Sequence, residues 1–457
     1  MKLGGLFSGI GGWEFAASMN GYDVPFCAEI EPFPCAVLAK RFPNTVNLGD
    51  VSRIRGGDIP DVDVLTYSFP CQSVSVAGKR EGVRHSEHGD SGTTRSGLFY
   101  EALRIIREMR EAYNNHLRFA VFENVMGLLS SGKGEDFARI LEEIIGIRQK
   151  GVTVPRPQKW EHAGTILGDD WSIAWRCLDS QYWGVPQRRK RIFLVADFGG
   201  ECAPEILFKS DCVCGDFEKS LKQRSDSSKN FGNGFGKADS AGEQVLDYLM
   251  LENHPLDSRV KICEDGICQT LSARCGTGGG NVPMVTTDDA AKHGVVYGLD
   301  RAAYNQGKNA KFDFIVDEKV MPTMVARGPN AVCSELCTTH NGEKSIVGGE
   351  KDVSATEGSY DSNYVVRRLI PTECSRLMGF PDGWVDNISF DNPDIVYWRK
   401  VWDTWDDMNK SKHKTDKQIL RWCQKPETDA AKYKAFGNGV AIPNVYFILR
   451  RIKEVAG

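Results

Sequence analysis

The sequence has no apolar run close to the roughly 18 residues that a membrane-spanning helix needs. Its amino terminus also has no charged region followed by an apolar core, which is the pattern of a secretory signal. Both absences favour a cytoplasmic protein. A composition of 41% hydrophobic and 26% charged residues excludes disordered and collagen-like chains, and the 457 residues are enough for about two or three domains.

Cysteine is scarce for a disulfide-stabilised protein, because the 14 cysteines are spread over a long chain and stand mostly alone. We therefore expect reduced thiols. Cys212 and Cys214 form one closer pair, and Cys263 and Cys268 form another. Neither spacing matches the usual zinc ligands, so no metal site is predicted.

An excess of positive charge is missing as well. The chain has 57 Lys and Arg against 61 Asp and Glu, which gives a formal net charge of −4. This balance argues against a protein that coats nucleic acid without regard to sequence, since such domains are usually basic. A locally basic cleft is still compatible with it.

Residues 1–199 alternate short apolar runs with helical patterns. The apolar runs predict strands at residues 2–7, 22–28, 62–67, 119–122, 172–177 and 192–196. The helical patterns lie at residues 10–19, 33–41, 98–113 and 137–145. This order of elements predicts an α/β fold of the doubly wound, Rossmann-like kind.

The middle of the chain differs in character, because glycine, serine and aspartate are abundant there and helical periodicity is weak. We interpret it as a second, loop-rich domain. Regular patterns return after it, and a segment rich in tryptophan and lysine follows at residues 398–425. The expected parts are 1–199, the first domain; 200–365, the loop-rich domain; 366–430, a helix with an insertion; and 431–457, an amphipathic terminal helix.

A glycine-rich turn, Phe7-Ser8-Gly9-Ile10-Gly11-Gly12, joins the first expected strand to the first helix and lets a ligand approach the backbone. About twenty residues later Glu29 ends the second strand, where such a domain places an acid against ribose hydroxyls. Asp50, in Gly49-Asp50-Val51, stands further along the chain. Together these features predict a cofactor that contains adenosine. Because Glu14 stands where a dinucleotide turn has its third glycine, S-adenosylmethionine is favoured over a dinucleotide.

Two candidate catalytic residues follow neighbouring strands. Cys71, in Ser68-Phe69-Pro70-Cys71-Gln72, comes at the carboxyl end of one strand, and Glu123, in Glu123-Asn124-Val125, at the end of the next. A thiolate that attacks an electron-poor ring needs an acid to protonate the ring, and a glutamate with a raised pKa can supply that proton. The alternative is that Cys71 is a buried structural thiol.

A basic run, Gln187-Arg188-Arg189-Lys190-Arg191, precedes the last strand and contains no acid. Four adjacent cations are commonly a solvated face. Beside a strand end they also suit a phosphate or a carbonyl oxygen, and they would favour a thiolate at Cys71.

With Arg368 to Gly379 and Gly437-Asn438-Gly439-Val440, these motifs occur in the order typical of the DNA cytosine-5 methyltransferases, a family that the sequence resembles over both of its ends. The resemblance implies one methyltransferase domain built from both chain ends, with a target-recognition domain between them. It implies S-adenosyl-L-methionine as cofactor and double-stranded DNA as partner of a prokaryotic, nucleoid-associated enzyme. We expect a monomer on DNA, in restriction-modification with a cognate endonuclease or in phage self-protection.

The resemblance also implies a role for each site residue. Cys71 would add to carbon-6 of cytosine, and Glu123 would contact nitrogen-3 and the exocyclic amine. Arg189 is expected near the base carbonyl and the thiolate, with Arg191 as the second arginine of the motif. The implied cofactor residues are Phe7, Ser8, Gly9, Gly11, Gly12, Glu29 for ribose, Ile30, Asp50 for the adenine amine, Val51, Pro70, Leu98, Asn438 and Val440. The implied substrate residues are Gln72, Ser75, Asn124, Gln187 and Thr270.

A stacked base cannot reach such a pocket, so the target base must flip out of the duplex, and we interpret residues 73–95 as the lid that closes over it. Thr270 and Thr323 compete for a role in supporting the flipped base, and the glycine run after Thr270 favours it. Lysines 410, 412, 414 and 417 either contact phosphate or belong to a solvated insertion.

Two other functions stay open at this point. One is a tRNA cytosine-5 methyltransferase, against which the large middle domain argues. The other is a catalytically silent DNA-binding relative, against which the presence of Cys71, Glu123 and Arg189 argues.

Overall fold

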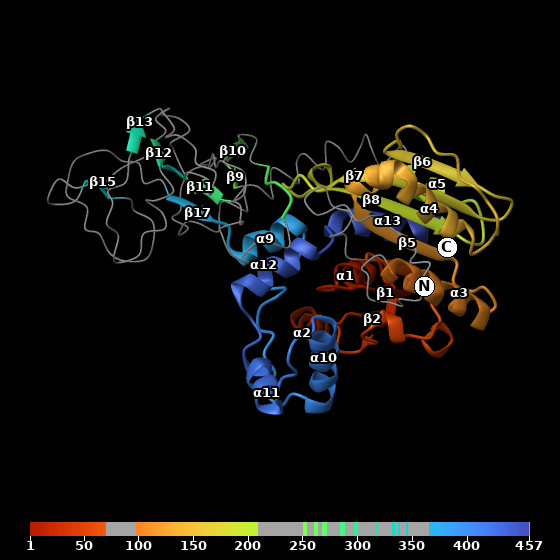
Figure 1. Ribbon diagram of the computed structural model, residues 1–457, viewed down its shortest axis with the longest axis horizontal. Helices are drawn as coiled ribbons and strands as arrows, with labels where there is room; N and C mark the ends of the chain where they lie inside the picture. Colours follow the sequence, from red (N-terminus) through yellow and green to blue (C-terminus); the bar gives the residue numbers. More distant parts are fainter. Residues whose placement is uncertain are drawn as a thin grey trace.

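The computed structural model describes residues 1–69, 97–208, 267–271 and 369–456, together with short strands between residues 250 and 368 (Figure 1). An eight-stranded sheet in the order β3-β2-β1-β4-β5-β8-β7-β6 forms its centre. The strands are β1 (Lys2–Leu6), β2 (Asp23–Ala28), β3 (Val46–Asn47), β4 (Val64–Tyr67), β5 (Phe119–Val125), β6 (Ala163–Leu167), β7 (Ser172–Asp179) and β8 (Lys190–Asp197). The α/β fold expected from the sequence is thereby confirmed.

The first five strands of the sheet run parallel, whereas β8 pairs antiparallel with both β5 and β7. All four residues of β4 are buried, as expected for a strand covered on both faces. The carboxyl ends of β1 to β5 therefore meet at one edge of the sheet, and the amino end of β8 lies at that edge too. Two strands, β3 and β6, were not predicted: β3 has only two residues, and the burial of β6 alternates as in a strand with one solvated face.

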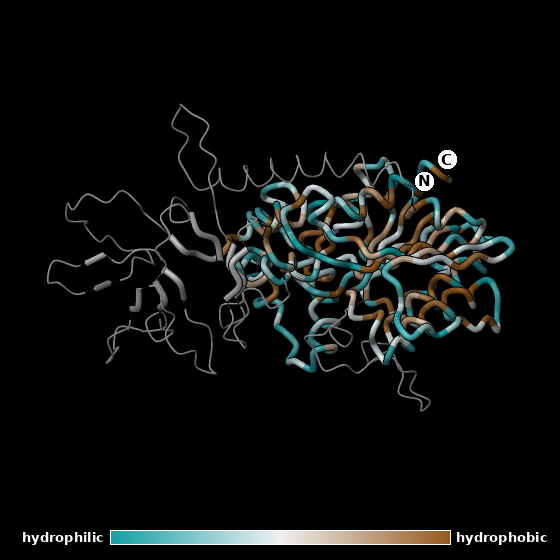
Figure 2. The backbone as a smooth tube through the Cα atoms, turned by 90° about the horizontal axis from the view of Figure 1, so that it is seen from above, coloured by the Kyte–Doolittle hydropathy of each residue, from teal (hydrophilic) through white to brown (hydrophobic). Residues whose placement is uncertain are grey.

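Helices cover both faces of the sheet (Figure 1). The helices of the described ranges are α1 (Gly12–Met19), α2 (Pro32–Arg41), α3 (Gly97–Ala112), α4 (Glu135–Ile145), α5 (Ala203–Phe208), α9 (Pro371–Met378), α10 (Ile395–Met408), α11 (Asp416–Gln424), α12 (Asp429–Asn438) and α13 (Ile442–Ala456). One apolar core lies between the sheet and α3 and α4, and another lies between the sheet and α1, α5 and α13. Figure 2 shows hydrophobic stretches, in brown, running through this part of the chain.

The two ends of the chain share a core. Helix α13 packs against α1, and the hydroxyl of Tyr22 donates a 2.8 Å hydrogen bond to the carbonyl of Leu449. Ile448 is fully buried in the cluster that also contains Leu3 of β1 and Val64 of β4. Helix α13 therefore covers the face of the main sheet that carries Leu3 of β1 and Val64 of β4.

A third apolar cluster joins α2 to α9, α10, α11 and α12. Much of the segment 398–425 is helical, and the rings of Trp398 and Trp402 on α10 pack on Trp422 of α11. Of the lysines considered for phosphate binding, Lys414 forms a 3.1 Å ion pair with Asp406 and lies over the Trp402 ring. No helix in the described ranges is long and apolar enough to cross a membrane.

Three smaller sheets lie between residues 250 and 368, in the orders β10-β9-β11-β17, β13-β12-β14 and β15-β16. Their strands are β9 (Met250–Asn253), β10 (Val260–Cys263), β11 (Met284–Thr287), β12 (Tyr297–Leu299), β13 (Val316–Glu318), β14 (Ala331–Cys333), β15 (Cys337–Thr338), β16 (Lys344–Ser345) and β17 (Val365–Arg368). Strand β17 leads directly into α9, so the chain returns to the first domain there.

Replacing Ile448 by alanine tests whether α13 stabilises the main sheet. We expect the free energy of unfolding to fall by about 2–5 kcal/mol, because the change leaves a cavity in the core beside β1. The rate of hydrogen exchange of the β1 amides should rise as the free energy of unfolding falls. Val396→Ala is the control, since this side chain is 76% exposed, and it should change stability by no more than about 0.5 kcal/mol. Equal effects of the two substitutions would contradict the assignment.

Candidate functional site

The glycine-rich turn after β1 has a left-handed backbone at three positions, with φ of 61° at Phe7, 55° at Gly9 and 83° at Gly11. The amide of Ser8 donates to the carbonyl of Ala28, and the amide of Gly11 donates to the carbonyl of Ser8, both at 3.0 Å. A Cβ at Gly9 would meet no atom within 4 Å. The turn is therefore fixed by its own hydrogen bonds and leaves open space beside its backbone.

Glu29, directly after β2, lies against this turn. Its Oε2 accepts a 2.8 Å hydrogen bond from the amide of Gly9, and its Oε1 accepts from the amides of Ile30 and Glu31, also at 2.8 Å. Burial raises the pKa of Glu29, and these three amides oppose the rise because they favour the carboxylate. Asn47 Oδ1 accepts from the amide of Glu29 at 3.0 Å, so Asn47 is an orienting residue that sequence reasoning missed.

The other expected cofactor residues of this edge follow β3 and begin α3. Asp50 Oδ1 accepts hydrogen bonds from the amide of Ser52 at 2.9 Å and from its hydroxyl at 2.8 Å. Asp50 thereby caps the short helix Val51–Arg53. Val51 is buried, and Leu98 is partly buried against the same core. The structure thus brings Glu29, Asp50 and the glycine turn to one edge of the sheet.

The terminal motif meets the start of α1. A Cβ at Gly12 would lie 2.7 Å from Cγ2 of Val440, so a larger residue does not fit at Gly12 without movement. Val440 is buried, whereas Asn438, at the end of α12, is exposed.

Glu123 lies inside β5, close to its carboxyl end, and is 7% exposed. Because β5 and β8 are antiparallel, Val125 stands opposite Arg191, and Arg191 lies diagonally across from Glu123. Nε of Arg191 lies 3.2 Å from Oε1 of Glu123. Burial raises the pKa of Glu123, while Arg191, Arg189 and a hydrogen bond with Ser68 oppose the rise. Ser68 is a further site residue that sequence reasoning did not single out.

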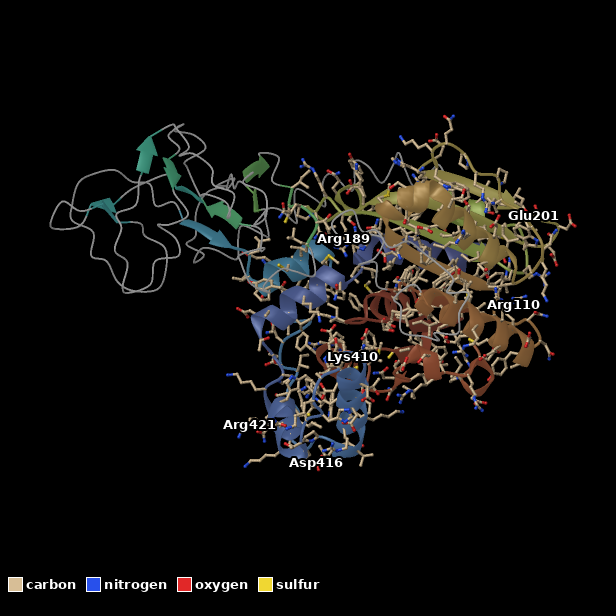
Figure 3. All side chains as sticks on the ribbon, viewed as in Figure 1. Arg110, Arg189, Glu201, Lys410, Asp416 and Arg421 are labelled. Atoms are coloured by element: carbon tan, nitrogen blue, oxygen red, sulfur yellow. The ribbon has the colours of Figure 1, made fainter. Side chains whose placement is uncertain are left out.

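Arg189 is 2% exposed, and Figure 3 shows it where the main sheet meets α9 and α12. Its guanidinium donates to the carbonyls of Leu271 at 3.1 Å and Gly437 at 3.2 Å, and to that of Gly439. These hydrogen bonds go to main-chain carbonyls, whereas the ion pair with Glu123 belongs to Arg191. Arg189 therefore joins three segments of the chain, and Arg191 faces the candidate acid.

Residues 267–271 dock on the basic run. The amide of Cys268 donates to the carbonyl of Pro186, and the amide of Arg188 donates to the carbonyl of Cys268, both at 2.8 Å. Thr270 Oγ1 donates to the carbonyl of Arg188. Gln187 is fully buried, with Nε2 donating to the carbonyl of Leu377 at 3.3 Å. Thr323, the competitor of Thr270, lies outside the described residues.

Asn124 links β5 to the end of β4, because its Nδ2 donates to the carbonyl of Phe69 at 3.5 Å. Phe69 is the last described residue before the expected nucleophile. Pro70, Cys71, Gln72 and Ser75, with the expected lid at 73–95, lie outside the described residues. Within the ranges that the structure describes, no group of three or more His, Cys, Asp or Glu residues is placed to hold a metal ion.

Comparison with known proteins gives one family and several relatives. The model of the family described as C-5 cytosine-specific DNA methylase matches residues 1–390. A protein of Escherichia phage P1 named DNA N-6-adenine-methyltransferase is 27% identical over 99% of this chain and 61% of its own length. Type II methyltransferase M.Bsp6I of Bacillus sp. (strain RFL6) is 25% identical over 73% of this chain and 94% of its own.

Type II methyltransferase M.NgoBV of Neisseria gonorrhoeae is 29% identical over 46% of this chain and 44% of its own length. The chain therefore spans less than two thirds of the length of the phage P1 and Neisseria relatives.

Replacing Arg191 by glutamine tests the ion pair with Glu123. The buried carboxylate would lose its neighbouring charge, so its pKa would rise further and ionisation would cost more. Below the ordinary glutamate pKa of about 4.3 the carboxyl is protonated and the loss of stability should be small. As the pH rises towards 8 we expect the loss to grow to about 3 kcal/mol, measured by urea unfolding.

Arg53→Gln is the matched control, because Arg53 is 67% exposed and lies 3.6 Å from Asp50. It should cost no more than about 1 kcal/mol at either pH. A loss in Arg191→Gln that is the same at pH 4 and pH 8 would show that the guanidinium does not act on a titrating carboxyl.

Proposed function

Because this chain belongs to the C-5 cytosine-specific DNA methylase family, we propose that it is an enzyme that methylates carbon-5 of cytosine in DNA. The observation that carries the proposal is the buried pair of Glu123 and Arg191. It lies at the edge of the sheet where β4 ends, and Asn124 ties this edge to Phe69, two residues before Cys71. An acid, a cation and a thiol at one strand edge suit an attack on an electron-poor ring.

We propose S-adenosylmethionine as the cofactor, and the residues of the turn fit it. Glu29 presents a carboxylate at the end of β2, the backbone at Gly9 borders open space, and the buried hydroxyl of Ser8 has no hydrogen-bond partner among the described residues. Phe7, Gly11 and Gly12, with Ile30, Asp50, Val51, Pro70, Leu98, Asn438 and Val440, complete the proposed pocket. The cofactor supplies a methyl group on a positively charged sulfur.

The chain's own residues would prepare the cytosine. The Cys71 thiolate adds to carbon-6, and the electron pair of the ring moves towards carbon-5 as charge develops at nitrogen-3. Glu123 holds the proton at nitrogen-3, for which its raised pKa is suited. Arg191 keeps the Glu123 carboxyl in place and lies closer to it than a single water would allow, at 3.2 Å. After carbon-5 has received the methyl group, a water molecule would take its proton, and the electron pair of that C–H bond would re-form the ring double bond and expel the Cys71 thiolate from carbon-6.

The remaining parts of the chain would serve recognition. Residues 200–365 would read the target sequence, residues 73–95 would close over the flipped base, and Thr270, held on the basic run, would support it. Gln72, Ser75, Asn124 and Gln187 would complete the substrate side. We propose a role in restriction-modification or phage self-protection, in a cytoplasmic and nucleoid-associated enzyme, with a cognate endonuclease as a partner.

One observation favours a second candidate. The relative that spans 99% of this chain is named an N-6-adenine-methyltransferase. The exocyclic amine of adenine is itself the nucleophile, so its methylation needs no thiolate. A dependence on Cys71 therefore separates the two reactions.

The decisive experiment incubates the protein with labelled S-adenosylmethionine and duplex DNA or tRNA, followed by mass spectrometry of the nucleosides. We expect 5-methylcytosine from DNA, and a covalent adduct with DNA that contains 5-fluorocytosine. Cys71→Ala should abolish both. Label in N6-methyladenine would support the second candidate, label on tRNA alone would identify an RNA enzyme, and no label would leave a DNA-binding relative.

Glu123→Gln tests the proposed acid. The amide has the shape of the carboxyl but cannot transfer a proton, so we expect kcat to fall by at least about a hundredfold. The affinity for S-adenosylhomocysteine, measured by calorimetry, should stay that of the wild type. Glu143→Gln is the control, because Glu143 pairs with Arg107 on the helical surface, and it should retain turnover. Unchanged turnover in Glu123→Gln would refute the assigned role.

A further inference from the structure

The α10–α11 hairpin, residues 395–425, is a part of the chain that the proposed reaction leaves without a role. It contains eight lysines and arginines against four aspartates, which gives it a formal charge of +4 in a chain whose formal net charge is −4. Figure 3 shows Asp416 and Arg421 on its outer part, away from the main sheet. The hairpin therefore concentrates positive charge on a protein that is acidic as a whole.

The aspartates of the hairpin do not neutralise all of this charge, because each already has a basic partner. The pairs are Asp403 with His413 at 3.4 Å, Asp406 with Lys414 at 3.1 Å, Asp407 with His413 at 2.7 Å, and Asp416 with Arg399. Four other cations of the hairpin have no ion-pair partner in the described part of the chain, namely Lys410, Lys412, Lys417 and Arg421. Their charge is left for a ligand from outside.

Three of these four cations face a common hollow in the surface, with a volume of about 620 Å³. Its lining includes Lys412 and Lys414 from the loop and Lys417, Gln418 and Arg421 from α11. The side-chain carbonyl of Gln418 accepts hydrogen bonds from the amide and the hydroxyl of Thr415, at 2.9 Å and 3.1 Å. The amide nitrogen of Gln418 is therefore its remaining polar group, so the hollow offers N–H donors from several side chains.

Helix stability does not explain the cations on α11. Lys417 stands in the first turn of this helix, where the helix dipole favours an acid and disfavours a cation. Arg421 follows four positions later, on the same face, and like charges at that spacing repel each other. Both placements lower the stability of the isolated helix, and a bound anion would reverse both effects.

The hairpin is fixed beside the candidate site. Nζ of Lys434, in α12, lies 5.2 Å from the ring centre of Trp405 in α10 and 2.6 Å from the carboxylate of Glu31. Glu31 follows Glu29, the proposed ribose acid, by two residues. Figure 1 shows the hairpin and the small sheets of residues 250–368 on either side of α9 and α12. A long ligand that reaches the site edge of the main sheet would therefore have the hairpin at its flank.

We propose that the α10–α11 hairpin binds the phosphate backbone of duplex DNA beside the target site. This inference rests on the proposed function and names a further surface for its partner. Lysine, arginine and amide side chains are the usual donors to phosphate oxygens, and a duplex repeats the phosphate along both strands. Backbone contacts carry no sequence information, so the hairpin adds affinity for any duplex and leaves the choice of sequence to other residues.

The test measures the affinity of the full chain for a random-sequence duplex of about 40 base pairs, roughly four helical turns, by fluorescence anisotropy over a series of salt concentrations. The double variant Lys417→Gln with Arg421→Gln should weaken binding by about tenfold at physiological salt. It should also lower the slope of log affinity against log salt by about 2, because each phosphate contact contributes about 0.9 to that slope.

Two control variants separate the hairpin from net charge and from packing. Lys2→Gln with Lys150→Gln removes the same charge from exposed positions, one at the amino end of β1 and one after α4, and should leave the slope within about 0.5 of wild type. Lys417→Arg with Arg421→Lys keeps both charges in the hollow and should keep the slope. The affinity for S-adenosylhomocysteine, measured by calorimetry, should be that of the wild type in all three variants, which shows that the fold is intact.

An unchanged slope in Lys417→Gln with Arg421→Gln would overturn the inference, and so would a loss of affinity confined to duplex RNA. Calorimetric binding of inorganic phosphate that this variant loses, with unchanged affinity for the DNA duplex, would identify a site for a small anion instead. A protein that binds DNA through the hairpin but forms no methylated base would refute the proposed reaction and leave this inference standing. Methylation with the same KM for DNA in the wild type and the variant would refute only the role of the hairpin.

Discussion

The burial of one guanidinium, that of Arg189, is the constraint on which the arrangement of the site depends. A buried cation with five N–H donors is stable only where the protein supplies acceptors for them. Here carbonyls of Leu271, Gly437 and Gly439 supply three such acceptors, and they come from distant parts of the sequence. Their positions relative to β8 follow from that need. The terminal motif is thereby held where Val440 can pack on Gly12 and close the start of α1.

Charge is separated along the edge of the sheet where the candidate site lies. Carboxyl groups gather where β1, β2 and β3 end, as Glu14, Glu29 and Asp50 show, whereas the arginines stand at the start of β8. A positively charged cofactor suits the first side and the carbonyl of a base or a phosphate suits the second. The net charge of −4 conceals this division, because a sum over the chain carries no information on placement.

Much of this arrangement is predictable from the sequence. The alternation of apolar runs with helical patterns gives the ends of the strands, and the parallel topology brings those ends to one edge of the sheet. The positions of Glu29 and Glu123 at that edge were predicted in this way. The sequence singled out Glu14 only because it breaks a dinucleotide pattern. Its carboxyl occupies the space that a side chain at Gly5, nine positions earlier, would need, and no sequence pattern reveals this. The different contacts of Arg189 and Arg191 could not be predicted from the sequence either, because the register of β5 on β8 decides which arginine meets Glu123. Paired helices in 398–425 depend on tryptophan contacts that no local pattern specifies.

The packing of α13 on the face of β1 has a consequence for synthesis of the protein on the ribosome. The first strand leaves the ribosome early, but the helix that covers it, Ile442–Ala456, is made much later. At about 5–20 residues per second the wait is on the order of tens of seconds. During that time the apolar side chains of Leu3 and Val64 are not covered by α13, so the nascent chain presents a surface that a chaperone can bind. Translation speed through the middle of the sequence would then influence how much of the protein reaches its native state.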